Sequence, residues 1–390
     1  MPQLQALRRM VCVIAVFIVA ASGHGRGQSP VPPRIELRVS TPPTAFAGSD
    51  GLVHLAYELQ INELSGASSA NLERVDVVGS DQKVLVTYAG SDLDGRVMRP
   101  GAERSVRYGR LIRGGTTALV HVWITVADAA AIPGSLRHFL AFSAEDGARV
   151  SAGVSVEVAR VRPIVLGSPL RAGIWLAHNG PGDNQSPHWG SALVHEQSAR
   201  IPQRYAIDFI GLDDAGRAVR GDLQKSSNGD WVGFGREVLA VTDGTIYAAQ
   251  DGVADNQPLV EPPPPARLSA TDVYGNYVIL AVGNGVFIHY AHLQSGSVAV
   301  RPGQSVRRGQ LLGRIGNSGN TNGAHLHFNV TNDPSPATAQ GVTFVFEAFE
   351  LLGTATAEQA VGSDASWSPP LSPSKRETAM PLGGAVVRFP

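Results

Sequence analysis

The sequence has almost no cysteine. Cys12 is the single cysteine in 390 residues, and it lies in an apolar N-terminal stretch that we expect to be removed. A mature chain without a thiol has no disulfide, no thiolate metal site and no cysteine nucleophile. These absences, together with an export signal, indicate a bacterial envelope protein that is stabilised by its hydrophobic cores alone.

Charge is also sparse. Charged residues make up 17% of the chain and the formal net charge is −1, whereas 43% of the residues are hydrophobic. The balance of charge gives no reason to expect nucleic acid or an anionic membrane as a partner. The hydrophobic content suits a globular protein with well-formed cores.

Long apolar runs are missing except near the start. Arg8 and Arg9 precede an apolar stretch from residue 10 to residue 21, which is too short to span a bilayer comfortably, and small residues follow it. We expect residues 1–28 to be a signal peptide, so the mature protein is exported to the periplasm or the extracellular space without a stable membrane span. The alternative is an uncleaved N-terminal anchor.

Long segments of helical periodicity are few, while Gly (44) and Pro (26) are abundant. Between residues 34 and 160 the chain repeats short alternating runs such as IELRVS, LVHLAYELQI and ALVHVWITVA, separated by turn residues. Runs of this kind predict an all-β chain whose first domain is an immunoglobulin-like β-sandwich. A chain of this length predicts two domains, so we place the second at 163–353. We expect a surface excursion over 250–272 and a partly disordered C-terminal tail over 354–390.

The run GAHLHFNV (323–330) carries two histidines two residues apart in a predicted strand. Side chains at i and i+2 of a strand project from the same face, so His325 and His327 should stand side by side. Two imidazoles on one face are a common beginning of a zinc site, although other metal folds use them as well.

Two other predicted strands carry polar residues that could belong to a metal site. Asp208 lies in the apolar run YAIDFI, where a carboxylate is costly unless it is paired or bound to a metal. A salt bridge to Arg204 is the alternative. In VFIHYAHL, strict alternation puts His292 and His289 on opposite faces, so at most one joins a site unless the strand bulges, and we expect His289 to point outward.

Over about residues 200–346 the chain resembles the lysostaphin-type zinc metallopeptidases, the glycyl-glycine endopeptidase family. The resemblance is carried by GREVLAVTDGTIYAAQDG, GNYVILAVGNGVFIHYAHL and VRPGQSVRRGQLLGRIGNSGNTNGAHLHF, in that order. It implies an antiparallel β metallopeptidase domain that binds Zn²⁺ through Asp208 and His327. It also implies that His325 lies beside a metal-bound water and that His292 acts as base or oxyanion stabiliser.

The chain departs from the family pattern at one ligand. The family has a histidine four residues before the aspartate, and here that position is Arg204, which stays protonated and cannot bind zinc. Only His178, His188 and His195 are near enough to replace it without rebuilding the domain. We predict His188, because it follows Pro187 in a Gly-, Pro- and Asn-rich loop able to fold over a groove, and because similar family members carry a histidine in this loop.

These observations support three functions. The first is an exported zinc metalloendopeptidase that cleaves peptide bonds of peptidoglycan cross-links or stem peptides. The second is a catalytically degenerate protein of the same fold that binds the cell wall or regulates a hydrolase, as Arg204 suggests. The third is another metal-binding β fold such as a cupin, against which the sequence lacks the expected glutamate spacing after the His-x-His pair.

Overall fold

The computed structural model describes residues 32–101, 107–183, 186–264, 269–362 and 373–390. Their regular structure is almost all β, with two short α-helices, α1 (Ala270–Tyr274) and α2 (Ala357–Val361). The all-β prediction is therefore confirmed. The expected signal peptide, residues 1–28, lies outside the described residues. Within them, no helix is long and apolar enough to cross a membrane.

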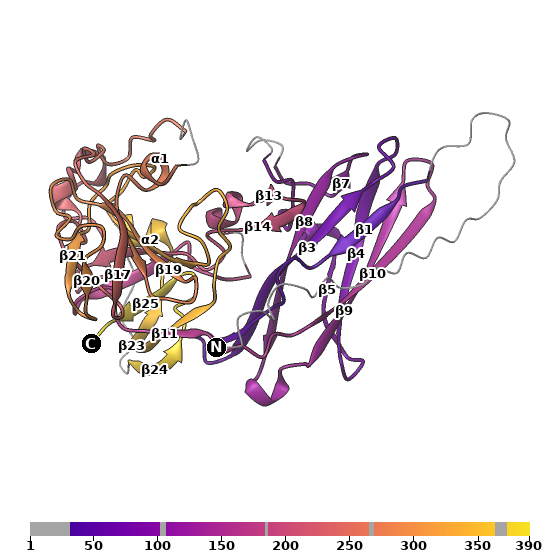
Figure 1. Ribbon diagram of the computed structural model, residues 1–390, viewed down its shortest axis with the longest axis horizontal. Coiled ribbons are helices and arrows are strands. Elements are labelled where there is room, and N and C mark those ends of the chain that lie inside the picture. The colour runs from indigo at the N-terminus through magenta and orange to yellow at the C-terminus, as the bar shows by residue number, and fades with distance from the viewer. Residues whose placement is uncertain (1–31, 102–106, 184–185, 265–268, 363–372) are drawn as a thin grey trace, which may run out of the picture. The chain divides into compact units, whose positions relative to one another are not determined.

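The chain divides into two compact units (Figure 1). The first holds residues up to Ala45, Val53–Val161 and Val194–Ala199, and the second holds Phe46–Leu52, Arg162–Leu193 and Arg200–Pro390. The main division falls at Val161 and Arg162, close to the boundary that the Gly- and Pro-rich sequence after residue 160 indicates.

The first unit consists of two antiparallel sheets. One has the strand order β1-β3-β8-β6 with β2 paired to β3, and the other has the order β10-β9-β4-β5 with β7 paired to β4. The strands are β1 (Ile35–Arg38), β2 (Ala45–Ala47), β3 (Val53–Glu63), β4 (Ala70–Gly79), β5 (Val84–Ala89), β6 (Val97–Met98), β7 (Leu111–Ile112), β8 (Thr117–Val126), β9 (Ser135–Ala144) and β10 (Arg149–Glu157).

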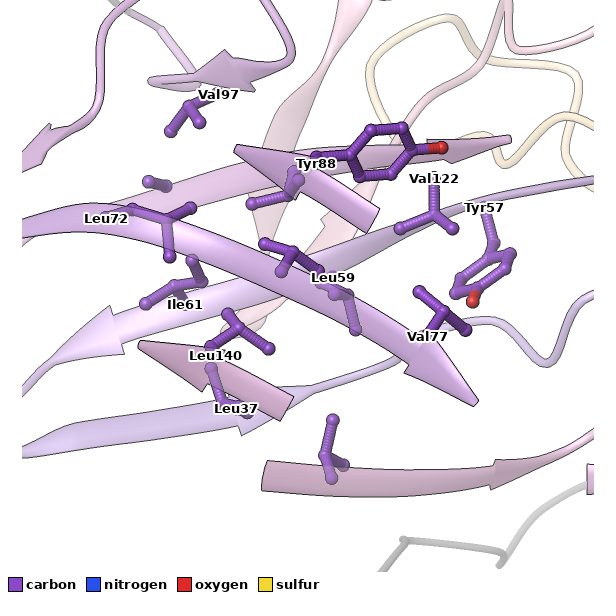
Figure 2. Packing of buried hydrophobic residues seen from close by; sticks show 14 of the residues in the cluster. Leu37, Tyr57, Leu59, Ile61, Leu72, Val77, Tyr88, Val97, Val122 and Leu140 are labelled. Atoms are coloured by element: carbon purple, nitrogen blue, oxygen red, sulfur yellow. The ribbon is translucent and has the colours of Figure 1, made fainter. Parts of the chain in front are cut away.

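The core of this unit lies between its two sheets. Alternate residues of β3, such as Tyr57, Leu59 and Ile61, belong to one buried cluster with Leu72 of β4 and Leu140 of β9. Figure 2 shows these side chains gathered in one layer. The period-2 pattern read from the sequence thus produces a sandwich. Its assignment as immunoglobulin-like stays a prediction.

The second unit is built on one large sheet, in the order β11-β23-β25-β12-β15-β22-β19-β18-β17-β20, with β24 paired to β23. A small sheet pairs β16 with β21, and the hairpin β13-β14 has its residues 194–199 in the first unit. The strands are β11 (Ile164–Leu166), β12 (Ile174–His178), β13 (Leu193–His195), β14 (Ser198–Arg200), β15 (Ile207–Leu212), β16 (Glu237–Leu239), β17 (Gly244–Gln250), β18 (Asn276–Ala281), β19 (Phe287–Leu293), β20 (Ser305–Val306), β21 (Leu311–Arg314), β22 (Leu326–Thr331), β23 (Phe344–Thr354), β24 (Ser374–Ala379) and β25 (Ala385–Arg388).

The described end of the tail that the sequence places at 354–390 is ordered. β25 lies inside the large sheet between β12 and β23, and Val386, Val387 and Phe389 are buried. The Ala-, Ser- and Pro-rich composition suggested disorder, but the apolar run AVVRF supplies a strand that the sheet completes. Residues 363–372 lie outside the described part of the chain.

Candidate metal centre

Three neighbouring strands place polar side chains in one row. His178 of β12 lies opposite Asp208 of β15, and Asp208 lies opposite His327 of β22. Directly opposed residues of adjacent strands project from the same face of a sheet. The row continues to β19, where Ala291 lies opposite His327. The lone aspartate and the His-x-His pair therefore meet because β15 and β22 are neighbours.

Asp208 is the centre of this cluster. Its Oδ1 lies 2.9 Å from Nδ1 of His327 and 3.5 Å from Nε2 of His325. Its Oδ2 lies 3.2 Å from Nε2 of His188 and accepts a hydrogen bond of 2.8 Å from Nδ2 of Asn179. Burial by itself would raise the pKa of Asp208, but the charges and hydrogen bonds of His188 and His325 hold that pKa well below its usual range. The side chain is therefore a carboxylate, the form that binds a metal.

His188 reaches Asp208 from a short 3₁₀ turn, Pro187–Ser191, whose preceding Ser186 side chain accepts a hydrogen bond from the His188 backbone N–H. Nδ1 of His188 donates to the carbonyl of Asn179 at 2.9 Å. A carbonyl only accepts, so Nδ1 carries a proton, and Nε2 is the atom that faces Asp208. Asn179 thus orients both His188 and Asp208, as the outer partners of metal ligands commonly do.

These donor atoms fit a zinc ion. One ligand atom each from His188, Asp208 and His327 lies within 4.8 Å of the others. Zinc bonds near 2.1 Å in tetrahedral geometry put ligand atoms about 3.4 Å apart, within about 0.5 Å of the 3.2 Å and 2.9 Å that separate the imidazoles from Asp208. On His327 the atom that faces Asp208 is Nδ1, at 2.9 Å from Oδ1, whereas Nε2 is buried and has no hydrogen-bond partner among the described residues.

Two further histidines stand beside this group. The ring of His292 lies 4.8 Å from that of His325 and 5.7 Å from that of His327. Nδ1 of His292 donates to the carbonyl of Ser318 at 2.8 Å, and Nδ1 of His325 donates to the carbonyl of Gly323 at 2.8 Å. Both imidazoles therefore have a fixed tautomer in which Nε2 is the atom left to exchange protons.

His292 joins the site through an unusual backbone conformation. Ala291 shares its face with His327, so simple alternation would turn the next residue to the opposite face. His292 instead has a φ of 61°, in the left-handed region that non-glycine residues seldom occupy. This turn brings its ring to the face that holds His325 and His327. It is the strand irregularity that would let His292 join the site, and the sequence alone could not locate it.

A hydrogen-bond network holds this conformation. The carbonyl of Leu293 accepts from Nδ2 of Asn276 at 3.0 Å and from Oγ of Ser318 at 2.7 Å. Ser318 also presents the carbonyl that binds His292, and its segment is held by Asp255, which accepts from the Asn317 backbone N–H at 2.7 Å. Part of the predicted 250–272 excursion thus supports the loop that orients His292.

His292 and His325 differ in their affinity for a proton. Burial lowers the pKa of His292 well below its usual value, and the neighbouring charges of His325 and His327 lower it further. Burial also disfavours the charged form of His325, but the carboxylate of Asp208 outweighs it and raises the pKa of His325. The pKa values of the two imidazoles are thus pushed apart, and His325 is the stronger base of the two.

The remaining candidate residues take other places. His195 lies outside the donor group, in β13, with its side chain 39% exposed. Arg204 is buried with its guanidinium over the ring of Tyr205. The expectation that His289 points outward is wrong: it is fully buried, with Nε2 2.7 Å from Oγ1 of Thr331. Every residue of β19 from Ile288 to Leu293 is buried, so both faces of the strand are covered at this position.

Comparison with known proteins bears on the same region. Residues 231–339 match the sequence model of Peptidase family M23. The chain carries a peptidase M23 domain. The matched M23 segment includes His292, His325 and His327, whereas His188 and Asp208 lie upstream of it.

Two curated relatives share part of the M23 domain. Over 65 residues the chain is 40% identical to the peptidoglycan DD-endopeptidase ShyA of Vibrio cholerae, covering 17% of this chain and 15% of that protein. Over 102 residues it is 34% identical to the DD-carboxypeptidase/endopeptidase Mpg of Neisseria meningitidis, covering 24% of this chain and 20% of that protein. The chain thus matches a fifth or less of the length of these relatives.

Among solved structures, the catalytic domain of the antimicrobial peptidase lysostaphin from Staphylococcus simulans is similar to part of the chain. The match has 24% identity and a TM-score of 0.20, and it covers 32% of this chain and 84% of that chain.

Proposed function

We propose that the second unit is a zinc metalloendopeptidase that hydrolyses peptide bonds of peptidoglycan cross-links or stem peptides. The observation that carries the proposal is the convergence of His188, Asp208 and His327 on one point beside the pair His292 and His325. The M23 match and the names of the curated relatives support peptidoglycan as the substrate.

His188, Asp208 and His327 would hold the ion. Zinc bound by three protein ligands supplies a water of lowered pKa and polarises the scissile carbonyl. The chain's own contribution to proton transfer comes from two imidazoles. His325 lies closest to the ligand group, with Nε2 3.5 Å from Asp208, so it is placed to take a proton from the attacking water. His292, held neutral by burial, completes the pair as base or as a stabiliser of the developing oxyanion.

The expected signal peptide supports the location of this activity in the periplasm or outside the cell. The competing proposal, a degenerate protein that binds the wall or regulates a hydrolase, was motivated by Arg204 at the position of a family ligand. His188 offers an imidazole to the same carboxylate, and this removes the main reason to expect a broken site.

The test is hydrolysis of purified peptidoglycan by the zinc-loaded chain, followed as the release of new amines and identified by mass spectrometry of the products. We expect new amines with the native chain and none with the His325→Ala variant at equal zinc content. No release from sacculi of several bacterial sources, by a chain that holds one zinc, would favour the non-catalytic function.

A further inference from the structure

A polar pocket of about 460 Å³ lies next to the candidate metal centre, within the second unit. One wall is formed by residues 178–180 and 186–187, and the other by residues 354–359 and 383–384. Both walls lie outside the M23 match, which covers 231–339. The pocket therefore lies outside the segment that matches the family model, as His188 and Asp208 do.

The pocket and the metal centre share a wall residue. Asn179 lines the pocket, donates through Nδ2 to Asp208 and accepts through its carbonyl from His188. His178, also in the wall, lies directly opposite Asp208 in the strand register. A substrate group in this pocket would thus lie beside Asn179, which contacts two of the proposed zinc ligands, Asp208 and His188.

Backbone contacts hold the C-terminal wall against the upstream wall. Gly384 donates to the carbonyl of Ala177 at 2.9 Å, and Gly383 donates to the carbonyl of Pro181 at 2.8 Å. A Cβ on Gly180 would lie 3.0 Å from the backbone N of Gly383. The two backbone segments therefore approach more closely than a side chain at Gly180 would allow. This wall is built into the fold and is not a loop that happens to lie nearby.

The chemistry of the lining indicates its occupant. Only Glu358 and His178 ionise among the described residues that line the pocket, and the other polar lining groups are amides, hydroxyls and backbone atoms. Hydrogen bonds from its own backbone N–H and from Thr356 lower the pKa of Glu358, so its side chain is an exposed carboxylate at neutral pH. The charge of His178 also lowers this pKa, but no lysine or arginine is among the described lining residues, so the carboxylate favours a positively charged ligand group.

We propose that this pocket is a substrate subsite that receives a side-chain ammonium group of the peptide, as a diamino acid carries, and that Glu358 pairs with it. The proposal rests on the proposed peptidase function and names one group that its substrate needs near the cleaved bond. It assigns a specificity role to the C-terminal segment, which the M23 match does not include.

The test uses two probe peptides that differ only in one group: a stem-type peptide with a free side-chain amine and the same peptide with that amine acetylated. Equilibrium binding of both peptides, and kcat/KM for both, are measured with the zinc-loaded full chain. We expect the native chain to prefer the free amine by about 10-fold in each measurement, the size of one charge-assisted contact.

The decisive variant is Glu358→Gln, which keeps the shape of the side chain and leaves the capping box of α2, formed by Thr356 and Gln359, in place. We expect it to lose the preference for the free amine while its zinc content and melting temperature stay unchanged. Glu377→Gln, an exposed carboxylate of β24 outside the pocket lining, is the matched control and should keep the preference.

The outcomes separate this proposal from the peptidase function. Cleavage of both peptides at equal rates by the native chain would overturn the subsite and leave the peptidase standing. Binding that depends on both the amine and Glu358, without any cleavage, would support the subsite and contradict the peptidase. A preference that survives in Glu358→Gln would place the ammonium group elsewhere.

Discussion

Nε2 of His188 lies 3.2 Å from Oδ2 of Asp208, although the two residues are separated by twenty positions in the chain. In the resembling family the corresponding histidine is four residues before the aspartate, on the same strand. Here that position is Arg204, and a loop supplies the imidazole instead. The carbonyl of Asn179 accepts from Nδ1 of His188, so Nε2 is the atom that faces the carboxylate.

The first prediction concerns this ligand. His188→Ala should weaken zinc binding by more than about 100-fold, because even the loss of an outer hydrogen-bond partner of a ligand costs 10- to 100-fold. Zinc per chain is measured by mass spectrometry of metals after dialysis against a competing chelator. His195→Ala is the control and should keep its zinc. Equal zinc retention by both variants would mean that His188 is not a ligand.

The second prediction separates ligands from proton carriers. His325→Ala and His292→Ala should each reduce turnover by about 100- to 10,000-fold, the usual contribution of a positioned acid or base, while one zinc stays bound. The measurements are kcat on a short wall peptide and the zinc content of the same sample. Release of zinc from His325→Ala would show that the roles within the His325 and His327 pair are exchanged.

The third prediction tests the left-handed backbone of His292. Both Gly and Ala remove the imidazole, but only Gly adopts a φ of 61° without strain, so His292→Gly should be more stable than His292→Ala. We expect a difference of about 1 kcal/mol in the free energy of unfolding, measured by urea denaturation of the zinc-free chain. His289, on the same strand without a positive φ, is the matched control, and there Ala should be the more stable replacement. The same order at both positions would contradict the role assigned to the His292 backbone.

The fourth prediction concerns acid stability of the first unit. Burial lowers the pKa of His138 to about 4, against 6.5 for the unperturbed side chain. Below pH 6.5 the unfolded chain binds a proton that the folded chain refuses, so the unfolded state gains stability as the pH falls. This residue should therefore have no effect above about pH 7 and should cost up to about 3 kcal/mol as the pH falls from 6.5 to 4.

The measurement is the free energy of unfolding of the first unit at pH 7 and at pH 4.5, for the native chain and for His138→Gln. The variant loses the hydrogen bond between Nε2 of His138 and the hydroxyl of Tyr57, so it should be less stable at pH 7. It should nevertheless lose less stability on acidification than the native chain. Parallel losses in both proteins would assign the acid sensitivity to other groups.

The fifth prediction concerns the C-terminal strand. Removal of residues 374–390 should prevent stable folding of the second unit. β25 lies between β12 and β23, so its loss would open the sheet and leave backbone groups of both neighbouring strands without hydrogen-bond partners. Phe389→Ala, which shortens one buried side chain, should cost about 3–5 kcal/mol. Lys375→Ala, at an exposed position of β24, should change stability by less than about 0.5 kcal/mol. Melting temperatures of the three proteins are the measurement, and a truncated chain that melts like the native one would contradict the central role of β25.

The sequence by itself determined the parts of this protein that depend on local periodicity. Alternation of apolar and polar residues predicted β-strands throughout and placed His325 and His327 on one face, because a strand has a period of two whatever it packs against. The apolar surroundings of Asp208 likewise marked it as a residue that must be paired or bound.

Only the tertiary structure decided which strands are neighbours and where the alternation breaks. His188 meets Asp208 because a loop folds back onto β15, and His292 reaches the site because its backbone turns into the left-handed region. β25 is ordered because two distant strands leave a position in the sheet for it. Each of these results depends on hydrogen bonds between residues far apart in the chain, such as those that Asn179, Asn276 and Ser318 make, and these leave no mark in the local sequence.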